Sequence, residues 1–263
     1  MDSDHGIPEV FRQTGLYLHR PSDTGLTETG LTQFQVLGER GSATNLVRKL
    51  IDKNLPLMRT EALGWKHGVP GMVAIPPDFL VVAVVRDARD WALSMHKRPW
   101  HADPTMQALP FAAFLRAEWR GIVDRPEDFD LIHPEIRDRV QGLPLHLDRH
   151  PITGLPYPNL FALRRTKLAG LLSFLRRECN LLLVRAETVQ DDPAGFVTWV
   201  QQQTGLPLEG GGISGVKRRL GTRFNPSVAR REATPESLAP EDLAFLRAEL
   251  DLPLEAALGY NYD

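Results

Sequence analysis

The run FLVVAVV at Phe79–Val85 constrains the fold more than any other feature of the sequence. All of its residues are apolar, and four of them are valine. A strand without a polar face must be covered on both sides, as at the centre of a parallel sheet. Apolar runs at 34–38 and 180–187 predict further buried strands, and helical patterns lie between the strands. This alternation predicts an α/β fold of three layers, with a central parallel sheet between helices.

The other segments are assigned from their own patterns. The stretch 62–70 predicts a short strand that ends near Lys66 or His67, and Pro193 and Gly205 have the positions expected at the two ends of a helix. Further helical patterns cover 44–54, 89–97, 111–123, 159–179 and 234–251. Residues 1–32 are polar and predict a loosely ordered leader, so that 33–263 form a single domain. Within it, 99–158 is rich in Pro, His, Asp and Arg and predicts an insertion over one edge of the sheet.

Composition narrows the functional classes. The chain has 263 residues and a formal net charge of −2, which favours neither nucleic acid nor an anionic membrane as a partner. The single cysteine, Cys179, excludes an intrachain disulfide and a multi-cysteine metal site. The polar N-terminus is unlike a signal peptide, and the apolar runs are too short to span a bilayer. We therefore expect a cytoplasmic protein without a membrane span.

The stretch GERGSATN at 38–45 joins a predicted strand to a predicted helix. Small residues allow backbone amides to approach an anion, and the start of the helix adds partial positive charge. Ser42, Thr44 and Asn45 could add side-chain donors, and Arg40 a full charge. The Gly-Lys-Ser/Thr of an ATP- or GTP-binding loop is absent. An ordinary capped junction between strand and helix is the alternative.

Three more stretches are expected at the same edge of the sheet, where the carboxyl ends of the parallel strands lie. RDARDWALS at 86–94 follows the central strand, GWKHGVP at 64–70 places Lys66 beside His67, and VKRRLGTRFN at 216–225 is a basic loop. Histidine titrates near neutrality and can act as a general base. Each stretch alone also has a structural interpretation: a capped, charged turn, a structural histidine, or a solvated loop.

In this order, the four stretches resemble the sulfotransferase family that uses 3′-phosphoadenosine 5′-phosphosulfate (PAPS). In that family a Lys/Arg-Ser-Gly-Thr-Thr type loop binds the 5′-phosphosulfate, and GSATN takes its place here. KHGVP followed by IPPDF is similar to the segment that holds the catalytic histidine. RDARDWALS is similar to the segment that binds the 3′-phosphate, and KRRLG to a late loop that covers that phosphate. The resemblance covers 34–94 well, 181–225 moderately and 99–158 hardly at all.

The resemblance implies a role for each matching residue. His67 would be the general base, with Glu39 as the second candidate, while Lys66 and Arg40 would stabilise charge on the leaving phosphate. The residues that would bind PAPS, or its product adenosine 3′,5′-bisphosphate (PAP), are Gly41, Ser42, Ala43, Thr44, Asn45, Arg86, Ser94, Lys217, Arg218, Arg219 and Gly221. No metal is implied. The chain departs from the family in having Gly41 where many members have lysine, Ala43 in place of glycine, and the histidine directly after the lysine.

Two other functions are left open by the residues. One is a P-loop kinase-like phosphotransferase that uses ATP and Mg²⁺, against which the loop lacks a Lys-Ser/Thr pair. The other is a catalytically silent nucleotide-binding scaffold, which Gly41 and Ala43 would suit. The acceptor, a small molecule or glycan with a hydroxyl or less readily an amine, would bind at 99–158. Helices in that segment could equally mediate a homodimer.

Overall fold

A mostly parallel sheet of five strands organises the protein in the computed structural model, which describes residues 6–21, 30–129, 132–216 and 223–263. The strand order is β1-β5-β4-β2-β3. β2, β3, β4 and β5 are parallel, and β1 is antiparallel to β5 at one edge. The strands are β1 (Leu16–His19), β2 (Gln33–Gly38), β3 (Met58–Arg59), β4 (Phe79–Val85) and β5 (Asn180–Arg185).

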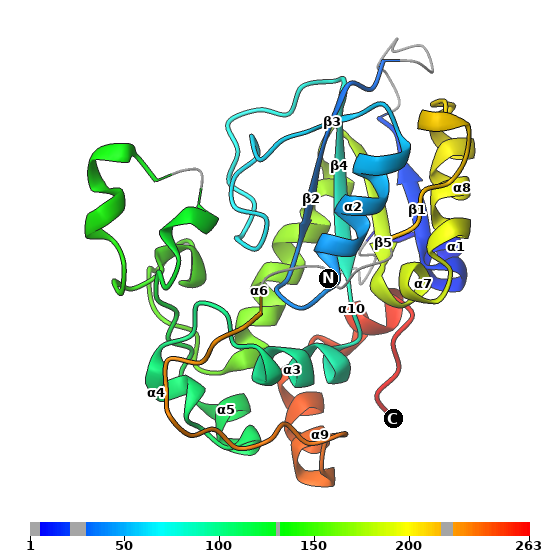
Figure 1. The fold of residues 1–263 in the computed structure, drawn as a ribbon. Coiled ribbons are helices and arrows are strands. Elements are labelled where there is room, and N and C mark those ends of the chain that lie inside the picture. The colour runs from blue at the N-terminus through cyan, green and yellow to red at the C-terminus, as the bar shows by residue number, and fades with distance from the viewer. Residues whose placement is uncertain (1–5, 22–29, 130–131, 217–222) are drawn as a thin grey trace.

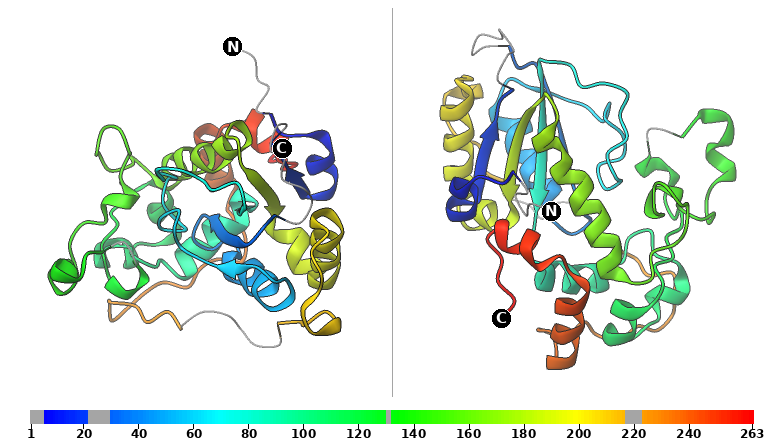
Figure 2. Two further views of the ribbon diagram at one scale, coloured as in Figure 1. Left: turned by 90° about the horizontal axis from the view of Figure 1, so that it is seen from above. Right: turned by 180° about the vertical axis from the view of Figure 1, so that it is seen from behind.

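Helices cover both faces of the sheet (Figures 1 and 2). One core packs α2 (Thr44–Asn54), α7 (Ala186–Asp191) and α8 (Pro193–Thr204) on one face. The other core packs the second face against the remaining helices. These are α1 (Glu9–Thr14), α3 (Ala88–Lys97), α4 (Pro104–Gln107), α5 (Phe111–Arg116), α6 (Leu160–Leu172), α9 (Pro240–Glu249) and α10 (Leu252–Ala257). Short 3₁₀ turns lie at Pro126–Asp128, Pro134–Arg139, His146–Asp148, Ser173–Arg176 and Glu209–Gly211.

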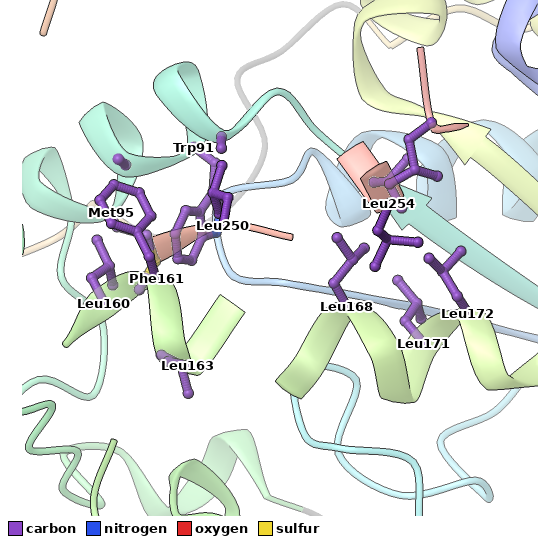
Figure 3. Packing of buried hydrophobic residues seen from close by; sticks show 14 of the residues in the cluster. Trp91, Met95, Leu160, Phe161, Leu163, Leu168, Leu171, Leu172, Leu250 and Leu254 are labelled. Carbon is purple, nitrogen blue, oxygen red and sulfur yellow. The ribbon is translucent and has the colours of Figure 1, made fainter. Parts of the chain in front are cut away.

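Helix α6 is the central support of the second face. Its apolar side chains pack on α3 and on the C-terminal helices, as Figure 3 shows for Phe161 near Trp91 and for Leu168 near Leu254. The helical pattern over 159–179 contains several charged residues, and two of them, Arg164 and Lys167, are buried. They are buried because they pair with acidic residues from other elements. Two charged residues of α6 therefore lie inside the fold.

The sheet confirms the predicted α/β fold, and the apolar sequence of β4 explains why this strand is central. Every residue of β4 is buried, as its continuous apolar run requires at the sheet centre. The predicted helix 44–54 and the helix that starts at Pro193 and ends before Gly205 are both present. The strand predicted within 62–70 is absent, and Met58–Arg59 pairs with β2 instead. Lys66 still contacts β2, because its carbonyl accepts a hydrogen bond from the Gly38 amide (2.9 Å).

Two further predictions differ from the structure. The predicted leader contains α1 and β1, and Leu16–His19 pairs with β5, so its described residues 9–19 belong to the sheet and its cover. Gly15, with φ of 75°, ends α1 and turns the chain into the strand. The helix predicted over 111–123 stops at Arg116, because the Trp119 amide bonds to the Tyr157 carbonyl (2.8 Å) and Gly121 pairs with Ala102. In the described part of the chain, no helix is long and apolar enough to cross a membrane.

Candidate functional site

A cavity of about 990 Å³ lies where β2 and β4 end and extends to Arg59 at the end of β3. Its volume is at the upper end of the range for small-molecule sites. The wall combines residues from the loop after β2 and the first turns of α2, from 59–67, from Arg86 and α3, and from 98–101, 125–129, 190 and 234–236. Its charged members are Arg40, Arg48, Arg59, Glu61, Lys66, Arg86, Asp90, Lys97, Arg98, Arg125, Glu127, Asp128 and Glu236. Cations therefore outnumber carboxylates in the wall, which favours an anionic ligand.

The loop between β2 and α2 makes a tight turn at this edge. Gly41 has φ of 78° and Ala43 has φ of 61°, both in the left-handed region. Ala43 is the N-cap of α2 and makes no side-chain cap. In the described residues, the amides of Thr44 and Asn45 form no hydrogen bond with another protein group. These two amides and the start of the helix can therefore receive an anion.

The predicted residues of this loop divide into two groups. Gly41, Ala43, Thr44 and Asn45 line the cavity. Ser42 does not line the cavity. It is fully buried, and its hydroxyl stabilises the turn by donating a hydrogen bond to the Glu39 carbonyl (2.6 Å).

The second candidate base, Glu39, also lies behind the loop. It is 3% exposed, does not line the cavity, and accepts from Arg164 (2.6 Å). Burial raises the pKa of Glu39 to about 7, although the Arg164 charge opposes that rise.

The pair Lys66 and His67 lies beside the loop, and both residues line the cavity. The His67 Nδ1 is 2.6 Å from the Gly38 carbonyl. A carbonyl oxygen only accepts, so Nδ1 carries the proton and the neutral ring keeps Nε2 as an acceptor. Burial and the Lys66 charge lower the pKa of His67 well below its usual value. His67 is therefore a neutral imidazole with a proton-accepting nitrogen.

Lys66 donates to the Asn45 side chain (3.0 Å), which ties it to the first turn of α2. Its pKa is lowered by burial first and then by the neighbouring charge of Arg48. A cation held beside the helix start adds to the positive potential that the exposed amides create.

Arg40 belongs to a buried ionic cluster that sequence reasoning did not predict. Its guanidinium pairs with Asp148 (2.6 Å) and donates to the Trp100 carbonyl (3.1 Å). Asp148 also pairs with Lys167 and accepts from the Trp119 ring nitrogen (3.0 Å). Burial alone would raise the pKa of Asp148, but the charges of Arg40 and Lys167 hold it well below its usual range.

Lys167 connects this cluster to the backbone of His67. Its ammonium donates to the His67 carbonyl (2.6 Å), and burial lowers its pKa to about 8. One carboxylate, Asp148, thus connects the loop after β2, the histidine segment and α6.

A second buried cluster centres on Arg164 of α6, which is fully buried. It pairs with Glu39 (2.6 Å) and Glu255 (2.7 Å), and it donates to the Arg86 carbonyl (2.7 Å). Burial disfavours the charge, but the two carboxylates raise the pKa of Arg164 well above its usual value. Because Glu39 follows β2 and Arg86 follows β4, Arg164 fixes the ends of both central strands.

Arg86 and Ser94 lie on the β4 side of the loop, and both line the cavity. Arg86 donates to the Gly41 carbonyl (2.7 Å) and lies 3.6 Å from Asp90. A methyl group at Gly41 would come within 2.8 Å of the Ser94 hydroxyl, so the two residues are in close contact. The structure therefore brings the loop, the histidine pair and the 86–94 segment to one cavity. The predicted Lys217, Arg218, Arg219 and Gly221 lie outside the described residues.

His101 is a cavity residue that sequence reasoning missed. It has φ of 59°, and its ring lies 2.5 Å from Asp124 and 3.4 Å from Asp128. Burial opposes its charge, but the two nearby carboxylates raise the pKa of His101. Within the described residues, no group of three or more His, Cys, Asp or Glu side chains is arranged to hold a metal ion.

Comparisons of the chain with protein-family models, with curated proteins and with solved structures gave no match.

Proposed function

We propose that the protein is a sulfotransferase that moves the sulfuryl group of PAPS to an acceptor hydroxyl. The observation that carries the proposal is the contact of the His67 Nδ1 with the Gly38 carbonyl (2.6 Å) beside the start of α2, which leaves Nε2 as the proton acceptor. A base and an anion-binding helix start that share one cavity suit transfer of a group carried by a phosphate. The resemblance of the 34–94 segment to the sulfotransferase family supports the same function.

The proposed reaction assigns a task to each group. The His67 Nε2 takes the proton of the acceptor hydroxyl while the acceptor oxygen bonds to sulfur. The bond between sulfur and the 5′-phosphate oxygen breaks, and PAP leaves with that electron pair. Lys66 and the amides of Thr44 and Asn45 stabilise the charge that develops on the leaving phosphate. Arg40 contributes its positive charge to the same stabilisation without a direct contact, because its guanidinium is already paired with Asp148.

In the same proposal, Arg86 and Ser94 bind the 3′-phosphate. This assignment is tested by replacing Arg86 with alanine and measuring the dissociation constants of PAP and of AMP, which lacks the 3′-phosphate. A hydrogen bond to a charged group contributes about 1.5–3 kcal/mol. We expect PAP to bind about ten- to a hundredfold more weakly and AMP to bind as before.

Arg89→Ala is the matched control, because Arg89 pairs with Asp87 (2.7 Å) and does not line the cavity. It should leave both affinities unchanged. Equal losses for PAP and AMP in Arg86→Ala would remove Arg86 from the 3′-phosphate role.

A further inference from the structure

Three cations lie together on the β3 side of the cavity, and the proposed binding of PAPS leaves two of them unused. Arg48 projects from α2 one turn after Thr44, and Arg59 is the last residue of β3. Both line the cavity with Lys66. Burial lowers the pKa of Lys66 most, and the charges of Arg48 and Arg59 add to that lowering, while the carboxylates of Glu61 and Asp128 oppose it. Like charges held this close repel each other, and a bound anion would relieve that repulsion.

The protein compensates these cations only in part. Arg48 has one ion pair among the described residues, to Glu61 at a long 3.8 Å. Its Nε is buried and has no hydrogen-bond partner in the described part of the chain. Arg59 makes no ion pair among the described residues, and its side chain is exposed and lines the cavity. The two guanidinium groups therefore have donors that no described group of the protein accepts.

The order of the strands separates this cluster from the 3′-phosphate site. Arg86 follows β4 and Arg59 ends β3, while β2 and its loop lie between them. Neighbouring strands are about 4.8 Å apart, and each residue advances a strand by about 3.3 Å. Arg59 pairs with Phe34, which is level with Leu80 of β4, five residues before Val85. The end of β3 therefore lies roughly 10 Å across the sheet and roughly 16 Å back along the strands from the end of β4. A nucleotide with its 5′-phosphate at the loop and its 3′-phosphate at Arg86 extends away from β3. The β3 side is then left for the acceptor.

We propose that Arg48 and Arg59, together with Lys66, form a subsite for an anionic group of the acceptor, such as a carboxylate or sulfate. Arginine guanidinium groups form paired hydrogen bonds with both kinds of anion. The subsite lies in the same cavity as His67. It therefore selects acceptors that carry an anionic group in addition to the hydroxyl that receives the sulfuryl group. This inference rests on the proposed function for the identity of the acceptor, but its anion preference is a property of the cavity alone.

The test compares two probes of nearly equal shape, 4-hydroxybenzoate and its neutral amide, 4-hydroxybenzamide. Their dissociation constants are measured by calorimetry on the protein saturated with PAP. The wild type should bind the carboxylate at least tenfold more tightly than the amide. In the double variant Arg48→Gln/Arg59→Gln this preference should disappear. In Lys49→Gln, which removes a charge from α2 outside the cavity, it should be retained.

Equal binding of the two probes by the wild type, or binding of neither, would overturn the proposal. So would a carboxylate preference that survives in the double variant. The response to PAP is measured separately and should be the same in all three proteins. If PAP does not bind the wild type, the proposed function fails, and the probe series repeated without PAP still decides whether the anionic subsite exists.

Discussion

At the scale of single residues, the hydrogen bond between His67 and Gly38 decides how the proposed base works. The lowered pKa keeps the ring neutral in the folded protein, whereas it would titrate near 6.5 in the unfolded chain. Between these two pKa values the unfolded state binds more protons, so this group makes the fold less stable as pH falls below about 6.5. We expect the His67 ring resonances in NMR spectra to stay constant from pH 8 to pH 6. A titration of His67 centred near pH 6.5 would contradict the assignment.

His67→Ala tests the chemistry more directly. The variant should lose sulfuryl transfer, measured as PAP released with an acceptor, by a factor of about 10²–10⁴, because a general base contributes that much. Its affinity for PAP should change little, since Thr44, Asn45 and Lys66 remain. Retained turnover would make Glu39 the leading candidate, although it lies behind the loop at 3% exposure.

Ala43 is the second residue whose own conformation matters. A left-handed residue with a β-carbon costs roughly 1–2 kcal/mol of stability. Replacing alanine with glycine costs about 0.4–1 kcal/mol in the other direction, because it makes the unfolded chain more flexible. Ala43→Gly should therefore raise the free energy of unfolding by up to about 1 kcal/mol in urea titrations. Ala244→Gly, at an exposed position inside α9, should lower it by about 1 kcal/mol. Equal losses in both variants would show that Ala43 is not strained.

At the scale of secondary-structure elements, α6 holds the ends of the two central strands through Arg164. Arg164→Met leaves Glu39 and Glu255 buried without their partner, which should cost about 3–5 kcal/mol of stability. Arg165→Met is the control, because Arg165 is half exposed and lies 4.0 Å from Glu249. That variant should lose less than about 1 kcal/mol. A small loss in Arg164→Met would mean that the strand ends are held by other contacts.

The elements also show what the sequence can and cannot predict. β4, α2 and α8 could be assigned because an apolar run, a helical period or a Pro and Gly at the ends acts locally. The pairing of β3 could not, since Met58 and Arg59 are exposed and depend on backbone bonds to β2. The clusters around Arg164 and Asp148 contain pairs that are 91, 108 and 125 positions apart. No local pattern contains such partners.

At the scale of the whole molecule, Asp148 connects the 99–158 segment to the loop and to α6. Asp148→Asn removes the carboxylate that pairs with both Arg40 and Lys167, so we expect a loss of about 3–5 kcal/mol near neutral pH. The pKa of Lys167, already lowered to about 8, should fall further. The unfolded chain then binds more protons than the fold, and the stability of the variant should rise with pH.

Urea titrations at pH 6, 7.5 and 9 measure this dependence. In the wild type, the contribution of Lys167 should rise mainly above pH 8, and in the variant the rise should begin at lower pH. Asp138→Asn, at an exposed position of the same segment, should reproduce the wild-type curve. A stability loss in Asp148→Asn that is equal at all three values would contradict the coupling to Lys167.

The proposal as a whole depends on the identity of the anion that the cavity accepts. Thermal stabilisation by PAP, compared with ADP and with ATP and Mg²⁺, tests this most directly. A ligand at 100 times its dissociation constant adds about 2.7 kcal/mol if it binds only the folded state. We predict selective stabilisation by PAP. Stabilisation by ATP with Mg²⁺ instead would indicate a kinase-like phosphotransferase, and no response to any of the three would contradict a nucleotide-dependent function.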